Sequence, residues 1–222
     1  MKVELVSLTK ALLTEKELTP EELIVYIARV SNPSNQMNFQ TSDRLIKYLI
    51  KNKHWSPFEM VDMTVDIYTS RAIAAQILRH RSFSFQEFSQ RYAEVTDFED
   101  IKLRKKGATN RQSSLEEFNP DLRTFEEDRH IWANEEIESH IQASKNLYKE
   151  LIKVGVATEC ARFVLPLSTQ TRIFMKGSIR SWIHYLQIRC DEHTQLEHRL
   201  VAEEIKHIFK ENFPNIAKAL EI

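Results

Sequence analysis

Glycine is scarce in this sequence, whose 222 residues contain three glycines, Gly107, Gly155 and Gly177. A Rossmann turn needs glycines spaced as G-x-G-x-x-G, and a P-loop needs two glycines shortly before a lysine. The three glycines stand too far apart to build either loop. Any nucleotide that this chain binds must therefore be held without a glycine-rich phosphate-binding turn.

The composition is typical of a folded globular protein of one large domain or two small ones. Hydrophobic residues make up 42% of the chain, enough for a sizeable core. The 31 lysines and arginines nearly balance the 32 aspartates and glutamates, so the chain lacks the basic excess of a nucleic-acid-binding domain. We expect no nucleic-acid partner, and any anion site must be local.

Export, a membrane span and a disulfide framework are not expected. The opening sequence MKVELVSLTK is too short and polar for a signal peptide, and no apolar run approaches the roughly 20 residues that cross a bilayer. The two cysteines, Cys160 and Cys190, have no C-x-x-C spacing. We therefore expect a cytoplasmic protein with no membrane partner, whose cysteines pack in helices.

Strand and helix patterns follow each other without regular alternation. Residues 60–70 alternate apolar and polar side chains, which indicates a half-buried strand, and Thr19 followed by Pro20 indicates a helix N-cap. Further strands are expected over 3–8 and 169–177, and further helices over 41–52, 71–80, 127–153, 157–166, 178–190 and 193–213. The apolar stripe of the last helix is Leu196, Leu200, Val201, Ile205, Ile208 and Phe209. This order favours an α+β fold. The polar stretch 97–126 is expected to be an exposed insertion.

Residues 79–91, RHRSFSFQEFSQR, concentrate cationic and hydroxyl groups in a nearly neutral chain. Arg79, His80 and Arg81 are expected in the last turn of the helix that begins after Ser70. Cations there stabilise the helix dipole by roughly 0.3–1 kcal/mol, which is the simpler explanation of their presence.

The second half of this stretch contains groups that suit a phosphate-bearing ligand. If the chain after Phe85 is extended, Glu87, Ser89 and Arg91 lie on one face of it. A guanidinium binds phosphate oxygens bidentately, and the carboxylate and hydroxyl can bind a hydrogen-bonding ring.

Arg79-His80-Arg81, seven residues and then Ser89-x-Arg91 resemble the R-H-R-x7-S-x-R signature of the flavin-dependent thymidylate synthases. Four further segments are similar to elements of that family and extend the match over most of the chain: ARVSN (28–32), HWSPFE (54–59), ARFVLPLSTQTR (161–172) and SIRSWIHYLQIR followed by HTQLE (178–197).

The resemblance implies an enzyme that makes dTMP from dUMP with methylenetetrahydrofolate as the carbon donor. NADPH reduces a bound FAD, which supplies the hydride, and no covalent bond joins the enzyme to dUMP. It also implies one domain over residues 1–222, a central, mostly antiparallel sheet flanked by helices, and a homotetramer whose subunits share active sites.

The resemblance also implies the residues of the site. The dUMP-binding set is Gln76, Arg79, Glu87, Ser89, Gln90, Arg91, Arg162 and Arg189. The FAD-binding set is Ser31, His54, Ser56, Glu59, Arg79, His80, Arg81, Gln86, Glu87, Arg180, His184 and His193. The catalytic candidates are Arg91, Ser89 and Arg189, with Arg91 stabilising negative charge beside the uracil. The chain departs from the usual family residues at Gln86, Gln90, Ser178 and His184.

The helix expected over 178–190 carries predicted ligand residues on two sides. Arg180, His184 and Gln187 share one face of a regular helix, and Arg189 lies opposite with His193. One helix rarely presents opposite faces to a single pocket, so we expect either that it serves two symmetry-related sites or that two chains share one site.

Two other classes of function stay open at this point. A metal-dependent phosphohydrolase could use ligands from the set His54, Asp62, His80, His184, His193 and His198, although H-E-x-x-H and paired-cysteine spacings are absent. A non-catalytic nucleotide-binding protein could use the same arginines without redox chemistry. Bound flavin, bound metal or neither would separate the three.

Overall fold

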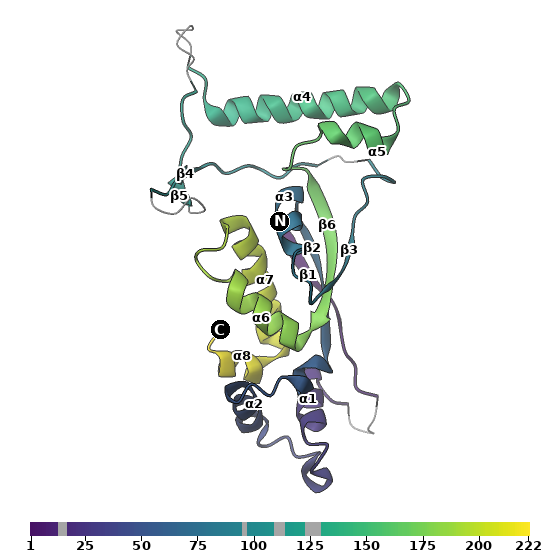
Figure 1. Cartoon of the computed structure of the whole chain (residues 1–222), viewed down its shortest axis with the longest axis vertical. Coiled ribbons are helices and arrows are strands. Elements are labelled where there is room, and N and C mark those ends of the chain that lie inside the picture. Colours follow the sequence, from purple (N-terminus) through teal and green to yellow (C-terminus); the bar gives the residue numbers. More distant parts are fainter. Residues whose placement is uncertain (13–16, 95–96, 109–113, 123–129) are drawn as a thin grey trace. The chain divides into compact units, whose positions relative to one another are not determined.

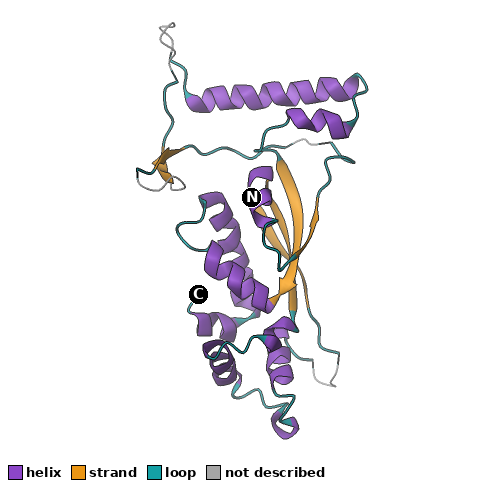
Figure 2. Ribbon diagram, in the orientation of Figure 1, coloured by secondary structure: helices purple, strands orange, loops and turns teal. Residues whose placement is uncertain are grey.

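A computed structural model describes residues 1–12, 17–94, 97–108, 114–122 and 130–222. Its main sheet has the strand order β1-β2-β6-β3, formed by Lys2–Leu8, Asp62–Ser70, Gln170–Ser178 and Ser84–Glu87 respectively (Figures 1 and 2). The backbone N–H of Thr9, directly after β1, donates to Asp62 O at the start of β2 at 3.1 Å. These two strands are therefore antiparallel, and the α+β class predicted from the sequence is confirmed.

The described chain divides into two compact units. Unit 1 comprises Met1–Ile67, Ile77–Gln86 and Ile173–Ile222, and unit 2 comprises Tyr68–Gln76 and Glu87–Arg172. Strands β2, β3 and β6 each continue from one unit into the other. Whether residues 1–222 act as one family domain stays a prediction.

The helices of unit 1 begin where local sequence signals place them. Helix α1 (Pro20–Ala28) starts with the capping box in which Thr19 Oγ1 accepts from the Glu22 N–H and Glu22 Oε2 accepts from the Thr19 N–H. Helix α2 (Ser42–Lys51) packs against α8 (Pro214–Leu220). The short 3₁₀ helices η1 (Pro33–Asn35) and η2 (Ser56–Glu59) lie on either side of α2 in the chain.

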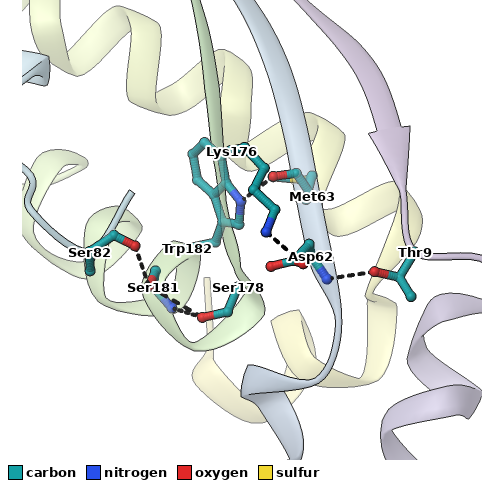
Figure 3. A network of polar contacts seen from close by, with 8 residues as sticks. All are labelled: Thr9, Asp62, Met63, Ser82, Lys176, Ser178, Ser181 and Trp182. Atoms are coloured by element: carbon teal, nitrogen blue, oxygen red, sulfur yellow. Dashed lines mark hydrogen bonds and ion pairs between the residues drawn. The ribbon is translucent and has the colours of Figure 1, made fainter. Parts of the chain in front are cut away.

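The core of unit 1 joins the sheet to the C-terminal helices. Helix α7 (Leu196–Asn212) contacts β1, and α6 (Ile179–Arg189) packs beside α7 (Figure 1). In the close view of Figure 3, the Trp182 indole on α6 reaches β2, where its Nε1 donates to Met63 O at 2.9 Å. Next to it, Lys176 on β6 pairs with Asp62 on β2 at 2.8 Å. Sheet and helix are thus fixed to each other by polar contacts as well as apolar packing.

The buried stripe of α7 differs from the one predicted. It consists of His198, Val201, Ala202, Ile205 and Phe209, whereas Leu200 is 47% exposed. The apolar stripe predicted from residue type placed the buried face correctly at Val201, Ile205 and Phe209. It missed His198, whose imidazole has a hydrogen-bond partner in the core that offsets the cost of its burial.

Unit 2 contains α3 (Arg71–Ile77), α4 (Ala133–Lys153), α5 (Thr158–Ala161), the 3₁₀ helix η3 (Arg162–Val164) and the antiparallel pair β4 (Arg104–Lys106) and β5 (Ser114–Glu117). Helix α4 packs against α5 (Figure 1). The predicted insertion 97–126 thus contains a small hairpin, and Phe98 is bridged to Thr169. Residues 109–113 and 123–126 of the insertion, and the predicted helix start at 127–129, lie outside the described residues.

The prediction that Arg79, His80 and Arg81 occupy the last turn of a helix is wrong. Helix α3 ends at Ile77, and these residues belong to the turns between α3 and β3. The chain must reverse there so that β3 can join the sheet beside β6.

Within the described ranges, no helix is long and apolar enough to cross a membrane.

Candidate functional site

The predicted ligand-binding residues are distributed unequally between the two units. Unit 1 contains the FAD-binding set except Glu87, together with Arg189 of the dUMP-binding set. Unit 2 contains the remaining dUMP-binding residues: Gln76, Glu87, Ser89, Gln90, Arg91 and Arg162. Arg79, predicted in both sets, lies in unit 1. Each unit therefore holds predicted ligand residues that have contacts within that unit.

A pocket of about 440 Å³ in unit 1 contains three of the predicted FAD-binding residues, Glu59, Arg180 and His184. Arg180 on α6 pairs with Glu59 at the end of η2, and Ser181 Oγ donates to Ser82 O at 3.2 Å. The complete lining among described residues is Trp55, Glu59, Ser82, Arg180, Ser181, Ile183, His184 and Gln187. The pocket thus combines a guanidinium, hydroxyls, an amide and an aromatic ring.

The first residues of helix α6 fix where the helix begins and contribute to the pocket. Ser178, one of the departures from the family pattern, is the N-cap, and its Oγ accepts from the Ser181 N–H at 3.3 Å. Serine is among the most favoured N-cap residues, so this departure is compatible with the start of the helix. Arg180, His184 and Gln187 lie together on the pocket side, as the helical spacing predicts, and the lining does not include Arg189.

A second group in unit 1 surrounds His80. Arg189 at the end of α6 donates from Nε to His80 Nε2 at 2.9 Å, so this nitrogen carries no proton. Burial, the cationic Arg189 and the neighbouring His184 together lower the pKa of His80 to about 4, with burial the largest cause. His80 is therefore a neutral hydrogen-bond acceptor at physiological pH, and it orients the Arg189 side chain.

Tyr185 and His198, which belong to neither the dUMP-binding nor the FAD-binding set, lie beside His80. The two rings are hydrogen-bonded through Tyr185 Oη and His198 Nε2 at 3.1 Å, and Tyr185 meets the His80 ring edge-on with centroids 4.9 Å apart. Burial lowers the pKa of His198 to about 3 and raises that of the Tyr185 phenol. Both side chains are therefore neutral. The only available signal was the helical spacing that places His198 on the apolar side of α7.

The other predicted residues of unit 1 lie at its surface. His193 lies beyond the end of α6, in the turn before α7, so the prediction that it shares a regular helix with Arg189 is wrong. There its N–H and Nδ1 both lie 2.8 Å from Asp191 Oδ1, which lowers the pKa of that carboxyl. The exposed remainder consists of Ser31, His54, Ser56, Arg79, Arg81 and Gln86.

In unit 2 the chain from Glu87 to Arg91 is not continuously extended. Strand β3 ends at Glu87, and the Tyr92 N–H donates to Ser89 O at 3.1 Å in a turn. The alternation of side chains predicted from Glu87 through Arg91 is therefore wrong beyond the end of the strand. The turn instead lets the Ser89 hydroxyl accept from the Arg91 N–H at 3.4 Å.

Two predicted dUMP-binding arginines meet at Glu159 of α5. Arg91 Nε lies 3.2 Å from Glu159 Oε2, and Arg162 Nε donates to Glu159 O at 3.2 Å. Gln90, between Ser89 and Arg91, is 6% exposed, and its Nε2 has no hydrogen-bond partner among the described residues. This group offers two guanidinium ions and a buried amide donor, which suits an anion with hydrogen-bond acceptors.

Glu87 is held by two residues outside the predicted ligand-binding sets. Arg71 Nη1 donates to Glu87 Oε1 at 2.6 Å, and Thr171 Oγ1 donates to the same oxygen at 3.0 Å. Gln76 is half-buried on α3. A separate pocket of about 380 Å³ between residues 97–101 and α4 contains none of the predicted site residues.

The metal-hydrolase alternative gains no support from the described part of the chain, where no three histidine, cysteine, aspartate or glutamate side chains gather as a metal site. His198, one of its candidate ligands, is instead bonded to Tyr185. Cys160 and Cys190 are free thiols, and burial raises the pKa of Cys190 to about 11.

Comparison with known proteins identifies the family. A family model described as "Thymidylate synthase complementing protein" matches residues 12–215. The chain is 48% identical over 223 residues to a flavin-dependent thymidylate synthase of Synechocystis, and all of both chains is covered. It is 50% identical over 229 residues to a probable flavin-dependent thymidylate synthase of Paramecium bursaria Chlorella virus 1, covering 100% of this chain and 99% of the relative. It is 35% identical over 192 residues to that of Thermosipho africanus, covering 86% and 81% respectively. The signature at Arg79–Arg91 and these matches along the whole chain agree, and this protein belongs to the flavin-dependent thymidylate synthase family.

Proposed function

We propose that this chain catalyses the reductive methylation of dUMP to dTMP. Methylenetetrahydrofolate supplies the carbon, and NADPH reduces a bound FAD. The observation that carries the proposal is the similarity to named flavin-dependent thymidylate synthases over the full length of the chain. One family model covers parts of both units, which supports the assignment of residues 1–222 to a single functional domain.

The unit 1 pocket has the chemistry to hold part of FAD. Its guanidinium, Arg180, suits a phosphate, and the Trp55 ring offers a surface for stacking. A volume of about 440 Å³ lies within the usual range for small-molecule sites. When bound, FAD supplies the hydride of the reaction. In this proposal, Arg180, Glu59 and His184 bind it, and His80 contributes as a neutral acceptor.

The unit 2 arginines bind and polarise dUMP in this proposal. Arg91 and Arg162 attract the dianion, and Arg91 stabilises the negative charge that develops on the uracil as its carbon 5 attacks the one-carbon unit. The unsatisfied Gln90 Nε2 is a donor for a ligand oxygen. Arg189 of unit 1, which His80 orients, also belongs to the dUMP-binding set of this proposal.

The reaction proceeds without a covalent enzyme nucleophile in this proposal. The Ser89 hydroxyl accepts from the Arg91 N–H, and that contact provides no base to remove its proton. The raised pKa of Cys190 keeps its thiol protonated and therefore a poor nucleophile. Two free thiols also agree with the reducing cytoplasm that we propose as the location.

The same proposal includes a homotetramer with shared active sites. Arg180, His184 and Gln187 line the pocket on one side of α6, whereas Arg189 contacts His80. Two ligand-binding sides on one helix support its participation in two symmetry-related sites.

Reconstitution tests the function directly. Purified protein should take up FAD, gain visible flavin absorbance, and form dTMP from dUMP when methylenetetrahydrofolate and NADPH are both present. Omission of FAD from stripped protein is the control. The protein should also restore growth of thymidine-requiring cells. A colourless protein that takes up no added FAD and forms no dTMP would refute the proposal.

A further inference from the structure

Arg71 is absent from the predicted ligand-binding sets, although its guanidinium contacts one of their members. It begins α3 directly after β2, and its Nη1 lies 2.6 Å from Glu87 Oε1. The two side chains are 33% and 19% exposed, so the pair is partly shielded from water. An ion pair in this environment is screened less than one at the open surface.

Thr171 on β6 completes the arrangement around Glu87. The residue is 4% exposed, and its hydroxyl donates to the same oxygen, Oε1, at 3.0 Å. Both contacts recorded within the described ranges therefore fall on Oε1. The other carboxylate oxygen, Oε2, remains able to accept a hydrogen bond from a ligand.

Backbone hydrogen bonds fix the three side chains in this geometry. The Arg71 N–H donates to Thr169 O at 2.9 Å, and the Phe88 N–H donates to Arg172 O at 2.8 Å. Thr171 lies between these two acceptor residues in the chain, so the backbones beside Arg71 and Glu87 are both anchored next to it. The arrangement belongs entirely to unit 2.

We propose that Arg71, assisted by Thr171, is a positioning residue for dUMP: it fixes Glu87 so that Oε2 accepts a hydrogen bond from a hydroxyl or ring N–H of the nucleotide. A carboxylate repels a phosphate, so Glu87 meets the uncharged part of dUMP while Arg162 attracts its dianionic end. Arg71 offsets the negative charge of Glu87 as the dianion binds. The inference rests on the proposed function, because it assigns Glu87 a partner in dUMP.

A double-mutant cycle on the FAD-loaded enzyme tests the proposal. The variants are Arg71→Met, Glu87→Gln and the double variant, and the measurement is the dUMP Kd from the change in flavin absorbance on titration. Each single variant should bind dUMP about tenfold more weakly, since a hydrogen bond to a charged group is lost or misplaced. The double variant should bind no more weakly than Glu87→Gln alone, because Arg71 acts through Glu87.

Additive effects, in which the double variant loses the product of the two single losses, would overturn the proposal. Lys153→Met is the matched control, because it removes an exposed cation from α4 of the same unit and should leave the dUMP Kd unchanged. Arg71→Lys should restore part of the affinity lost in Arg71→Met. If Arg71→Met does not fold, Thr171→Val and Arg71→Lys replace it in the cycle and should be non-additive with Glu87→Gln.

The same cycle measured by thermal unfolding of ligand-free protein separates the positioning role of Arg71 from the proposed function. Non-additive unfolding temperatures show the Arg71–Glu87 contact independently of any ligand. A wild type that shows this coupling and binds no dUMP overturns the proposed function and the positioning role together. A wild type that binds dUMP with additive variants overturns the role of Arg71 alone.

Discussion

At the scale of single residues, Glu159 links the family signature to the family segment at 161–172. It contacts Arg91 through its carboxylate and Arg162 through its backbone carbonyl. The Arg91 and Glu159 side chains are 57% and 54% exposed, and exposed ion pairs contribute little to stability. In the proposed function, a ligand phosphate or carbonyl can therefore replace this contact to Arg91 at small cost.

Arg91→Ala should abolish most dTMP formation while the protein retains FAD. Loss of a group that stabilises developing charge costs on the order of 100-fold in turnover. Most of the predicted FAD-binding residues lie in unit 1 and are unchanged by this substitution. dTMP formation and flavin absorbance measure the two effects. Arg44→Ala, an exposed arginine on α2, is the control, and undiminished turnover by Arg91→Ala would contradict the assigned role.

Gly177→Ala should destabilise unit 1 through a direct clash. A Cβ at this position would lie 2.5 Å from Phe83 Cδ1, and Phe83 is packed against Trp182 with ring centroids 4.7 Å apart. Overpacking of this kind costs typically 1–3 kcal/mol, measurable by urea unfolding. Phe83→Leu added to Gly177→Ala should recover part of the loss. Equal stability of Gly177→Ala and the wild type would show that Phe83 has room to move.

Sequence motifs selected candidate residues for the site but not their partners. The family resemblance selected Arg91, His80 and Glu87, but their contacts to Glu159, Arg189 and Thr171 span 68, 109 and 84 residues of chain. Such pairings depend on which strands and helices meet in the fold. A single sequence contains no local pattern for them, and for the same reason Arg71 and the Tyr185–His198 pair were missed.

At the scale of elements, helix starts were predicted well where a capping residue marks them. Thr19 and Ser178 both act as N-caps, at α1 and α6. Helix ends were predicted less well, because tertiary structure decides them. No glycine or proline stands between Ile77 and β3 to mark a helix end, but α3 ends at Ile77 and the chain turns into β3.

Thr19→Ala should lower the free energy of unfolding by about 1 kcal/mol, because it removes one half of a capping box. Ser139→Ala, an exposed hydroxyl on α4, is the matched control and should change stability by less than about 0.5 kcal/mol. Chemical unfolding of both variants gives the comparison. A change for Thr19→Ala no larger than that of the control would mean that the cap adds nothing to packing of α1.

At the scale of the whole molecule, the irregular order of strands and helices sufficed to predict the α+β class. The division into two units could not be predicted, because it follows long-range contacts and its boundaries fall inside strands β2, β3 and β6.

The active enzyme should have a mass in solution of four chains. The family resemblance implies the number four, and the two sides of α6 that carry predicted ligand residues are the physical reason to expect more than one chain. Light scattering coupled to size exclusion measures the mass, and activity assayed across the eluted fractions shows which species turns over. Activity confined to a monomer fraction would refute shared active sites.

The interrupted course of unit 1 through the sequence has a consequence for synthesis on the ribosome. Unit 2 ends at Arg172, whereas unit 1 includes residues from Met1 and also helices α6, α7 and α8 at the C-terminal end of the chain. Trp182, Val201 and Phe209 of its core are translated after all of unit 2. Unit 2 can complete its internal contacts while these helices are still being made, whereas unit 1 cannot close before they follow. Strand β1, made among the first residues of unit 1, therefore gains its contacts with α7 only after the whole of unit 2 has been synthesised.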